Sequence, residues 1–306
     1  MSSRIRVRSV VGEAFRIGAE RWPAFLRFFW LPTLLSALLI GGLMWGMIDF
    51  RSAEAAGPVA TLEELQQFIR APLPAFAALL ALAYLIAFIL QSGGLASFFR
   101  LVVLGENRRG LFQLRADGAA RRVLWSFAII VVIETLVFAL ALAAASAVTG
   151  EAPLASFERV AALTGRDQVT TGELFAAMKP FLMAVAFAIV PTIYLRIALV
   201  PLPVAAAVEE RVRLFGALGM TFGHWWSILF SLILCILAID GIVIGAGIGL
   251  LIVQAVGAML ATQSDFGAAG AIIAAVACVV LIGLYLFVAT VAFAMPAVIY
   301  RRLKAQ

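Results

Sequence analysis

Six long runs of apolar residues, interrupted by few or no charges, constrain the fold of this chain more than any other feature. Each reaches the roughly 20 residues that a helix needs to cross a hydrocarbon core about 30 Å thick. Only helices and closed barrels satisfy every backbone group in hydrocarbon, and unbroken runs favour helices over the alternating pattern of barrel strands. The sequence therefore predicts transmembrane helices over residues 25–48, 73–99, 123–148, 180–207, 225–254 and 268–299.

The amounts of apolar and charged residues agree with this fold class. The chain is 64% hydrophobic and 13% charged, whereas soluble domains are about a quarter charged. No segment between the runs is long enough to bury a core of its own. We therefore expect an all-α integral membrane protein in which residues 1–306 form a single membrane domain, with the six transmembrane helices paired in three hairpins.

The distribution of basic residues predicts the orientation of these helices. Seventeen of the 23 Lys and Arg residues fall on the side of the two termini and five on the other side, while Arg196 lies within a run. Because basic residues accumulate in cytoplasmic loops, both termini should be cytoplasmic. The arginines should contact anionic lipids of that leaflet, and we expect no binding to nucleic acid.

Two segments that precede apolar runs have the pattern of amphipathic surface helices. Residues 9–22 place Phe15 and Trp22 on an apolar face, and residues 209–224 do the same with Phe215 and Phe222. Both segments are predicted to lie flat in the headgroup layer.

Three ionisable residues fall inside the predicted transmembrane helices. At a rise of 1.5 Å per residue, Glu134, Arg196 and Asp240 all lie about 20 Å from the cytoplasmic ends of their helices. A charge at this depth is tolerated when it faces other helices, so Arg196 should pair with Glu134, with Asp240, or with both. The surplus carboxylate favours protonation of one acid and hence a proton-exchanging site. The alternative is an inert ion pair that sets the helix register.

Glycines and helix breakers mark two further features of the apolar runs. Gly241, Gly245 and Gly249 recur every four residues, the small-residue spacing that allows close packing of transmembrane helices. QSGG at 91–94 and VPLP at 200–203 interrupt two of the runs. Such breaks either expose backbone groups for binding or produce simple kinks.

The motifs of enzymes and metal sites are missing from the sequence. His224 is the single histidine and has no second histidine or cysteine nearby, so we expect no zinc site. We find no nucleophile elbow, P-loop or kinase signature. The sequence therefore predicts a protein that is not an enzyme and needs no metal or cofactor.

Two stretches, VVGEAFRIGAERWPAFLRFFWLP and YLRIALVPLPVAAAVEERVRLFGALGMTFGHWWSILF, resemble a group of bacterial multi-pass membrane proteins. The group includes the membrane domain attached to some glycerophosphodiester phosphodiesterases. The residues that carry the resemblance are Arg196, Pro201, Glu209, Ala217, Leu218 and Trp225. The resemblance implies a six-helix fold in a bacterial inner membrane. It implies no enzyme activity, because no soluble segment could hold the catalytic barrel.

Two functions follow from these features. The first is a membrane scaffold or accessory subunit with a membrane-protein partner. The second is a transporter or lipid-handling permease that uses the layer of Glu134, Arg196 and Asp240 for proton exchange or anion binding.

Overall fold

A computed structural model describes residues 6–54, 73–106, 117–163, 170–209, 211–261 and 267–306 of the chain. Every regular element in this part of the chain is a helix, which confirms the all-α prediction. Six of these helices are long and apolar enough to cross a membrane. They are α1 (Val7–Glu54), α3 (Leu73–Leu104), α4 (Gly118–Thr149), α6 (Thr171–Leu199), α9 (Trp225–Ala261) and α10 (Gly267–Lys304).

Three short helices complete the described part of the chain: α5 (Ala155–Leu163), α7 (Leu202–Val208) and α8 (Leu214–Thr221). The predicted helix at 180–207 is therefore α6 followed by the separate helix α7, with the break at Val200 and Pro201. Because proline has no N–H and its ring opposes a continuous helix, VPLP ends α6 as its composition indicates.

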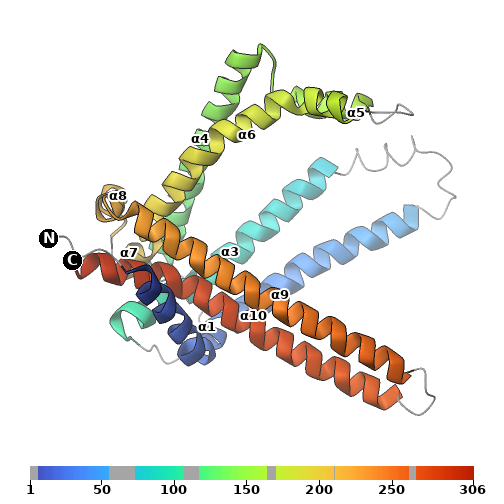
Figure 1. Cartoon of the computed structure of the whole chain (residues 1–306), viewed down its shortest axis with the longest axis vertical. Coiled ribbons are helices and arrows are strands. Elements are labelled where there is room, and N and C mark those ends of the chain that lie inside the picture. Colours follow the sequence, from blue (N-terminus) through green and yellow to red (C-terminus); the bar gives the residue numbers. More distant parts are fainter. Residues whose placement is uncertain (1–5, 55–72, 107–116, 164–169, 210, 262–266) are drawn as a thin grey trace.

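The long helices converge at one end of the molecule and diverge from it (Figure 1). We call the end where α1 begins and α10 ends the terminal end, and the opposite end the distal end. Consecutive long helices pack in pairs, α1 with α3, α4 with α6, and α9 with α10, and α1 also packs on α10. In Figure 1 the three pairs point in different directions from the terminal end.

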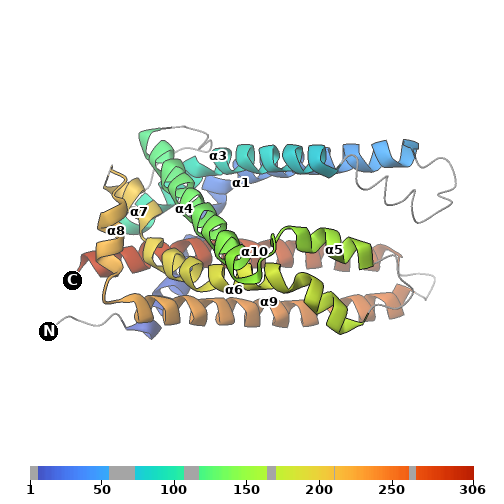
Figure 2. The ribbon, with the colours of Figure 1, turned by 90° about the horizontal axis from the view of Figure 1, so that it is seen from above.

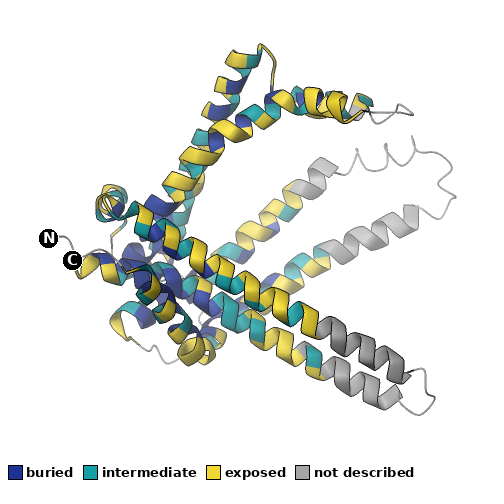
Figure 3. Ribbon diagram, viewed as in Figure 1, coloured by how far each residue is buried: buried dark blue, intermediate teal, exposed yellow. Residues whose placement is uncertain are grey.

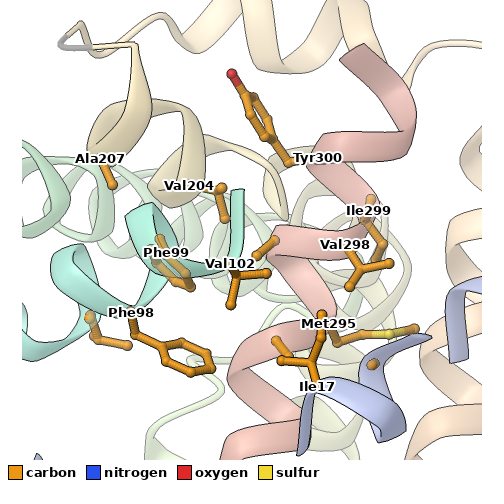
Figure 4. Packing of buried hydrophobic residues seen from close by; sticks show 14 of the residues in the cluster. Ile17, Phe98, Phe99, Val102, Val204, Ala207, Met295, Val298, Ile299 and Tyr300 are labelled. Atoms are coloured by element: carbon orange, nitrogen blue, oxygen red, sulfur yellow. The ribbon is translucent and has the colours of Figure 1, made fainter. Parts of the chain in front are cut away.

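The hydrophobic core lies at the terminal end (Figure 3). Figure 4 shows Phe98 of α3, Val204 of α7 and Met295, Ile299 and Tyr300 of α10 within this core. All five side chains are buried. Toward the distal end the helices carry large exposed apolar side chains, which is the favourable arrangement for a surface that meets lipid.

The predicted surface helix at 9–22 has a different place in the structure. It forms the first part of α1, and its apolar residues Val10, Ala14 and Ile17 are buried in the core rather than directed at headgroups. Figures 1 and 2 show that α1 then changes direction, in a helix that contains Pro23 and Pro32. Trp22, which the pattern placed on the apolar face, is 42% exposed, so the pattern identified only part of the face that is buried.

The segment at 91–94 also differs from its prediction as a helix break. It is helical and lies within α3, where Gly94 faces α1. A Cβ atom on Gly94 would lie 2.9 Å from the Phe28 carbonyl oxygen and 3.3 Å from the Phe29 ring. Glycine at this position therefore serves the close approach of α1 and α3, and the helix continues through it.

This close approach predicts the effect of adding one methyl group. Gly94→Ala should lower the free energy of unfolding by about 1–3 kcal/mol, because the backbone of α1 must move to accommodate it. Gly41→Ala on α1 is the control, because its Cβ would meet no atom within 4 Å. Thermal unfolding in mild detergent measures both variants. Equal melting temperatures for the two would contradict the packing.

Candidate functional site

A bidentate ion pair joins α4 and α6. Nε of Arg196 donates to Oε1 of Glu134 at 2.6 Å, and Nη2 donates to Oε2 at 3.1 Å. Two parallel charge-assisted hydrogen bonds of this kind fix the geometry more firmly than a single contact. The Glu134 side chain is 19% exposed and the Arg196 side chain is 69% exposed. The guanidinium is thus the outward member of the pair.

The neighbours of the pair show its level along the molecule. Ile133, next to Glu134, packs in a small cluster with Leu199 of α6 and Leu218 of α8. Tyr194, two residues from Arg196, stacks on Trp225 at the start of α9, with ring centroids 5.8 Å apart. Arg196 therefore lies near the terminal end of α6, three residues before its last residue, whereas Glu134 lies about halfway along α4.

The position of Arg196 differs from the depth obtained by counting residues. The predicted depth of Arg196 assumed one continuous helix over residues 180–207, whereas α6 ends at Leu199 and the separate helix α7 follows. Glu134 keeps its predicted position about halfway along its helix, because α4 is continuous. A residue count along a broken helix overestimates depth.

Asp240 does not join this pair. It is exposed on α9, and its side chain forms no ion pair or hydrogen bond with any residue in the described ranges. The structure thus brings together two of the three residues of the predicted polar layer. Residue counting estimates depth but not rotation about the helix axis, and rotation decides which side chains meet.

The three glycines of α9 do not approach another helix in the described part of the chain. A Cβ atom on Gly241, Gly245 or Gly249 would meet no atom there within 4 Å. The buried residues in the described part of α9 are instead Ile228, Ser231 and Cys235, which lie nearer the terminal end, where the long helices converge. The close packing predicted for these glycines is absent from the contacts that the structure describes.

A second polar site, which the sequence did not indicate, surrounds the end of α7. The residues from Leu202 to Ala207 are all buried. The last carbonyls of a helix have no partner within it. Here Nε of Arg122 on α4 donates to the Ala206 carbonyl at 3.1 Å, and Nη1 of Arg100 on α3 donates to the Ala207 carbonyl at 3.3 Å. Two arginines from other helices therefore cap this buried helix end.

Glu209 connects the same helix end to α10. Its Oε1 accepts hydrogen bonds from the Tyr300 hydroxyl at 2.6 Å and from Nζ of Lys304 at 3.0 Å. The hydrogen bond from Tyr300, followed by that from Lys304 and the positive charges of Lys304 and Arg213, holds the pKa of Glu209 below its usual value, against the opposing effect of burial.

A third polar contact joins the first and last helices. Glu13 of α1, whose side chain is nearly buried, forms ion pairs with Arg301 and Arg302 of α10, the latter at 2.8 Å. Glu209 and Tyr300 lie 91 positions apart in the sequence, and Glu13 and Arg302 lie 289 positions apart. Only the abundance of Arg and Glu in the flanking segments could have indicated them.

The contacts of these sites are ion pairs and hydrogen bonds between helices. Among the residues that the structure describes, no three or more His, Cys, Asp and Glu side chains gather as potential metal ligands. The resemblance to the phosphodiesterase-associated membrane domains stays a prediction, because no family model, curated protein or solved structure matches this chain.

The ion pair predicts how its variants behave. Glu134→Gln and Arg196→Met should each lower the melting temperature, because each leaves one polar partner unpaired. The double variant should recover much of the loss, since neither partner then remains. A double variant whose loss equals the sum of the single losses would show that the two groups act independently.

The lowered pKa of Glu209 predicts that the stability of the protein decreases in acid. The pKa of Glu209 in the folded state is depressed. Its contribution to the free energy of unfolding is therefore complete above the ordinary pKa of Glu, about 4.3, and is lost as the pH falls through the folded-state pKa. The melting temperature should therefore fall below about pH 4.3. Glu209→Gln should lower the melting temperature at pH 7. It should also reduce the further drop in melting temperature below about pH 4.3, the ordinary pKa of Glu. An unchanged acid dependence in Glu209→Gln would place the sensitive group elsewhere.

Proposed function

We propose that this chain is a scaffold or accessory subunit of a bacterial inner membrane, with the terminal end in the cytoplasm. One observation carries the proposal: the chain buries its side chains mainly at the terminal end and leaves long apolar helix faces uncovered beyond it (Figure 3). A protein built around one packed end can hold transmembrane segments of a partner against such faces. Leu140 of α4 and Val190 of α6, each 70% exposed, lie on them.

The basic residues of the terminal end support the proposed orientation. Arg6, Arg8, Arg121 and Arg302 are exposed there. An excess of positive charge next to the spans is typical of the cytoplasmic side.

The short helix α8 supports contact with the cytoplasmic leaflet. Phe215 and Phe222, at the two ends of this helix, are 84% and 83% exposed, and Arg211 and Arg213 precede it and are also exposed. Aromatic side chains beside arginines suit a membrane surface that contains anionic lipid. The helix is shorter than the predicted segment 209–224.

A lipid-handling permease is the second candidate. The exposed guanidinium of Arg196 on the outer surface of α4 and α6 favours it, since this group is open to the bilayer. A transport path through the protein has less support, because Glu134 and Arg196 lie on a lateral surface and Asp240 lies apart from them. The proposal assigns no catalytic step to the chain.

In-cell photo-crosslinking tests the scaffold. A benzophenone amino acid at Leu140 or at Val190 should crosslink to one discrete membrane protein, and native mass spectrometry should show that protein bound in a fixed ratio. The same amino acid at Ile228, which is fully buried in α9, is the control and should give no crosslink to another chain. Crosslinks to lipid alone at both lateral positions would refute the scaffold and favour the permease.

A further inference from the structure

The ion pair of Glu134 and Arg196 leaves part of the guanidinium unused. Glu134 accepts from Nε and Nη2, and Nη1 donates to no group in the described chain. An arginine has five N–H donors, so at least three remain on the outward side. A guanidinium that is 69% exposed beside a hydrocarbon layer needs a partner for these donors.

The level of Arg196 identifies where such a partner would come from. Arg196 lies three residues before the last residue of α6, and Tyr194, two residues before it, stacks on Trp225 at the start of α9. The long Arg196 side chain can therefore extend toward the interfacial layer of the terminal end. Phosphate oxygens of phospholipids lie at this level, and their paired oxygens match the planar fork of an arginine.

A strip of apolar side chains extends from Arg196 toward the distal end. Ile189, Val185 and Leu182 precede it by 7, 11 and 14 residues, so they share its face of α6, and all three are exposed. Fourteen residues of helix span about 21 Å, which exceeds half of a hydrocarbon core about 30 Å thick. The strip is therefore long enough to lie along one acyl chain.

We propose that α4 and α6 form a phospholipid-binding site, in which the outward donors of Arg196 bind the lipid phosphate and an acyl chain lies along Ile189, Val185 and Leu182. Glu134 fixes the guanidinium from behind and makes the pair formally neutral. The site therefore discriminates weakly between zwitterionic and anionic phospholipids. The inference does not rest on the scaffold function, because a structural lipid suits either candidate.

Lipid titration followed by native mass spectrometry tests the site. Delipidated protein in mild detergent is titrated separately with palmitoyl-oleoyl phosphatidylethanolamine and with palmitoyl-oleoyl phosphatidylglycerol. Arg196→Met should weaken the first binding event about tenfold for both lipids, the value of one strong charge-assisted hydrogen bond. The control is Arg159→Met, which removes an equal charge from the exposed pair with Glu151. It should leave binding unchanged.

Two further variants separate the phosphate contact from the acyl contact. Glu134→Gln leaves Arg196 with a net positive charge and should favour phosphatidylglycerol over phosphatidylethanolamine. Val185→Trp fills the strip of apolar side chains without changing the charge and should weaken the binding of both lipids. This variant also tests the site if Arg196→Met does not fold. Glycerol 3-phosphate, which carries the phosphate without acyl chains, should not compete.

Three outcomes would overturn the site: wild-type affinity in folded Arg196→Met, an equal loss in Arg159→Met, or full affinity in Val185→Trp. Displacement of the lipid by glycerol 3-phosphate would also overturn it, because the acyl chain would then contribute nothing. Failure of the crosslinking experiment at Leu140 and Val190 would leave these titrations unaffected, so the two proposals can fail separately.

Discussion

A buried helix end needs partners for its last carbonyls, and the architecture of the terminal end depends on how this need is met at α7. The break at Val200 and Pro201 produces a short helix whose residues are buried, where water is not available to its carbonyls. Arg122 and Arg100 supply the missing donors from α4 and α3. Both helices must therefore reach the end of α7, and Glu209 brings α10 to the same place through Tyr300 and Lys304.

The divergence of the helices toward the distal end has a related cause. Lipid is as apolar as a leucine side chain, so the hydrophobic effect does not drive transmembrane helices together, and specific packing or polar contacts must do so. At the terminal end these contacts are present: Gly94 admits the backbone of α1, and Glu13 pairs with Arg302. The exposed apolar residues farther along, such as Leu140 and Val190, are then free to meet lipid or a partner.

The pair of Glu134 and Arg196 lies between these two regions. It holds α4 to α6 with a bidentate contact, and the same geometry directs the remaining donors of the guanidinium outward. One side chain can thus serve both the cohesion of the helix pair and the binding of a ligand from the bilayer. This double role distinguishes it from the arginines at α7, which donate to backbone carbonyls of the protein itself.

The fold class and the six transmembrane helices could be predicted from the sequence because they depend on local quantities: the length of apolar runs and the absence of charges within them. The pairing of Glu134 with Arg196 was predicted as one of three alternatives, since charge in a membrane demands a partner but does not choose it. The rotation of α9 and its divergence from the other helices were not predictable: Asp240 does not reach Arg196, and a Cβ atom on Gly241, Gly245 or Gly249 meets no atom within 4 Å in the described part of the chain. The sequence alone determined that this is an all-α membrane protein with six long apolar helices. Only the tertiary structure decided that Val10, Ala14 and Ile17 lie in the core and that two arginines cap α7, because such contacts depend on the rotation and crossing of helices that lie far apart in the chain.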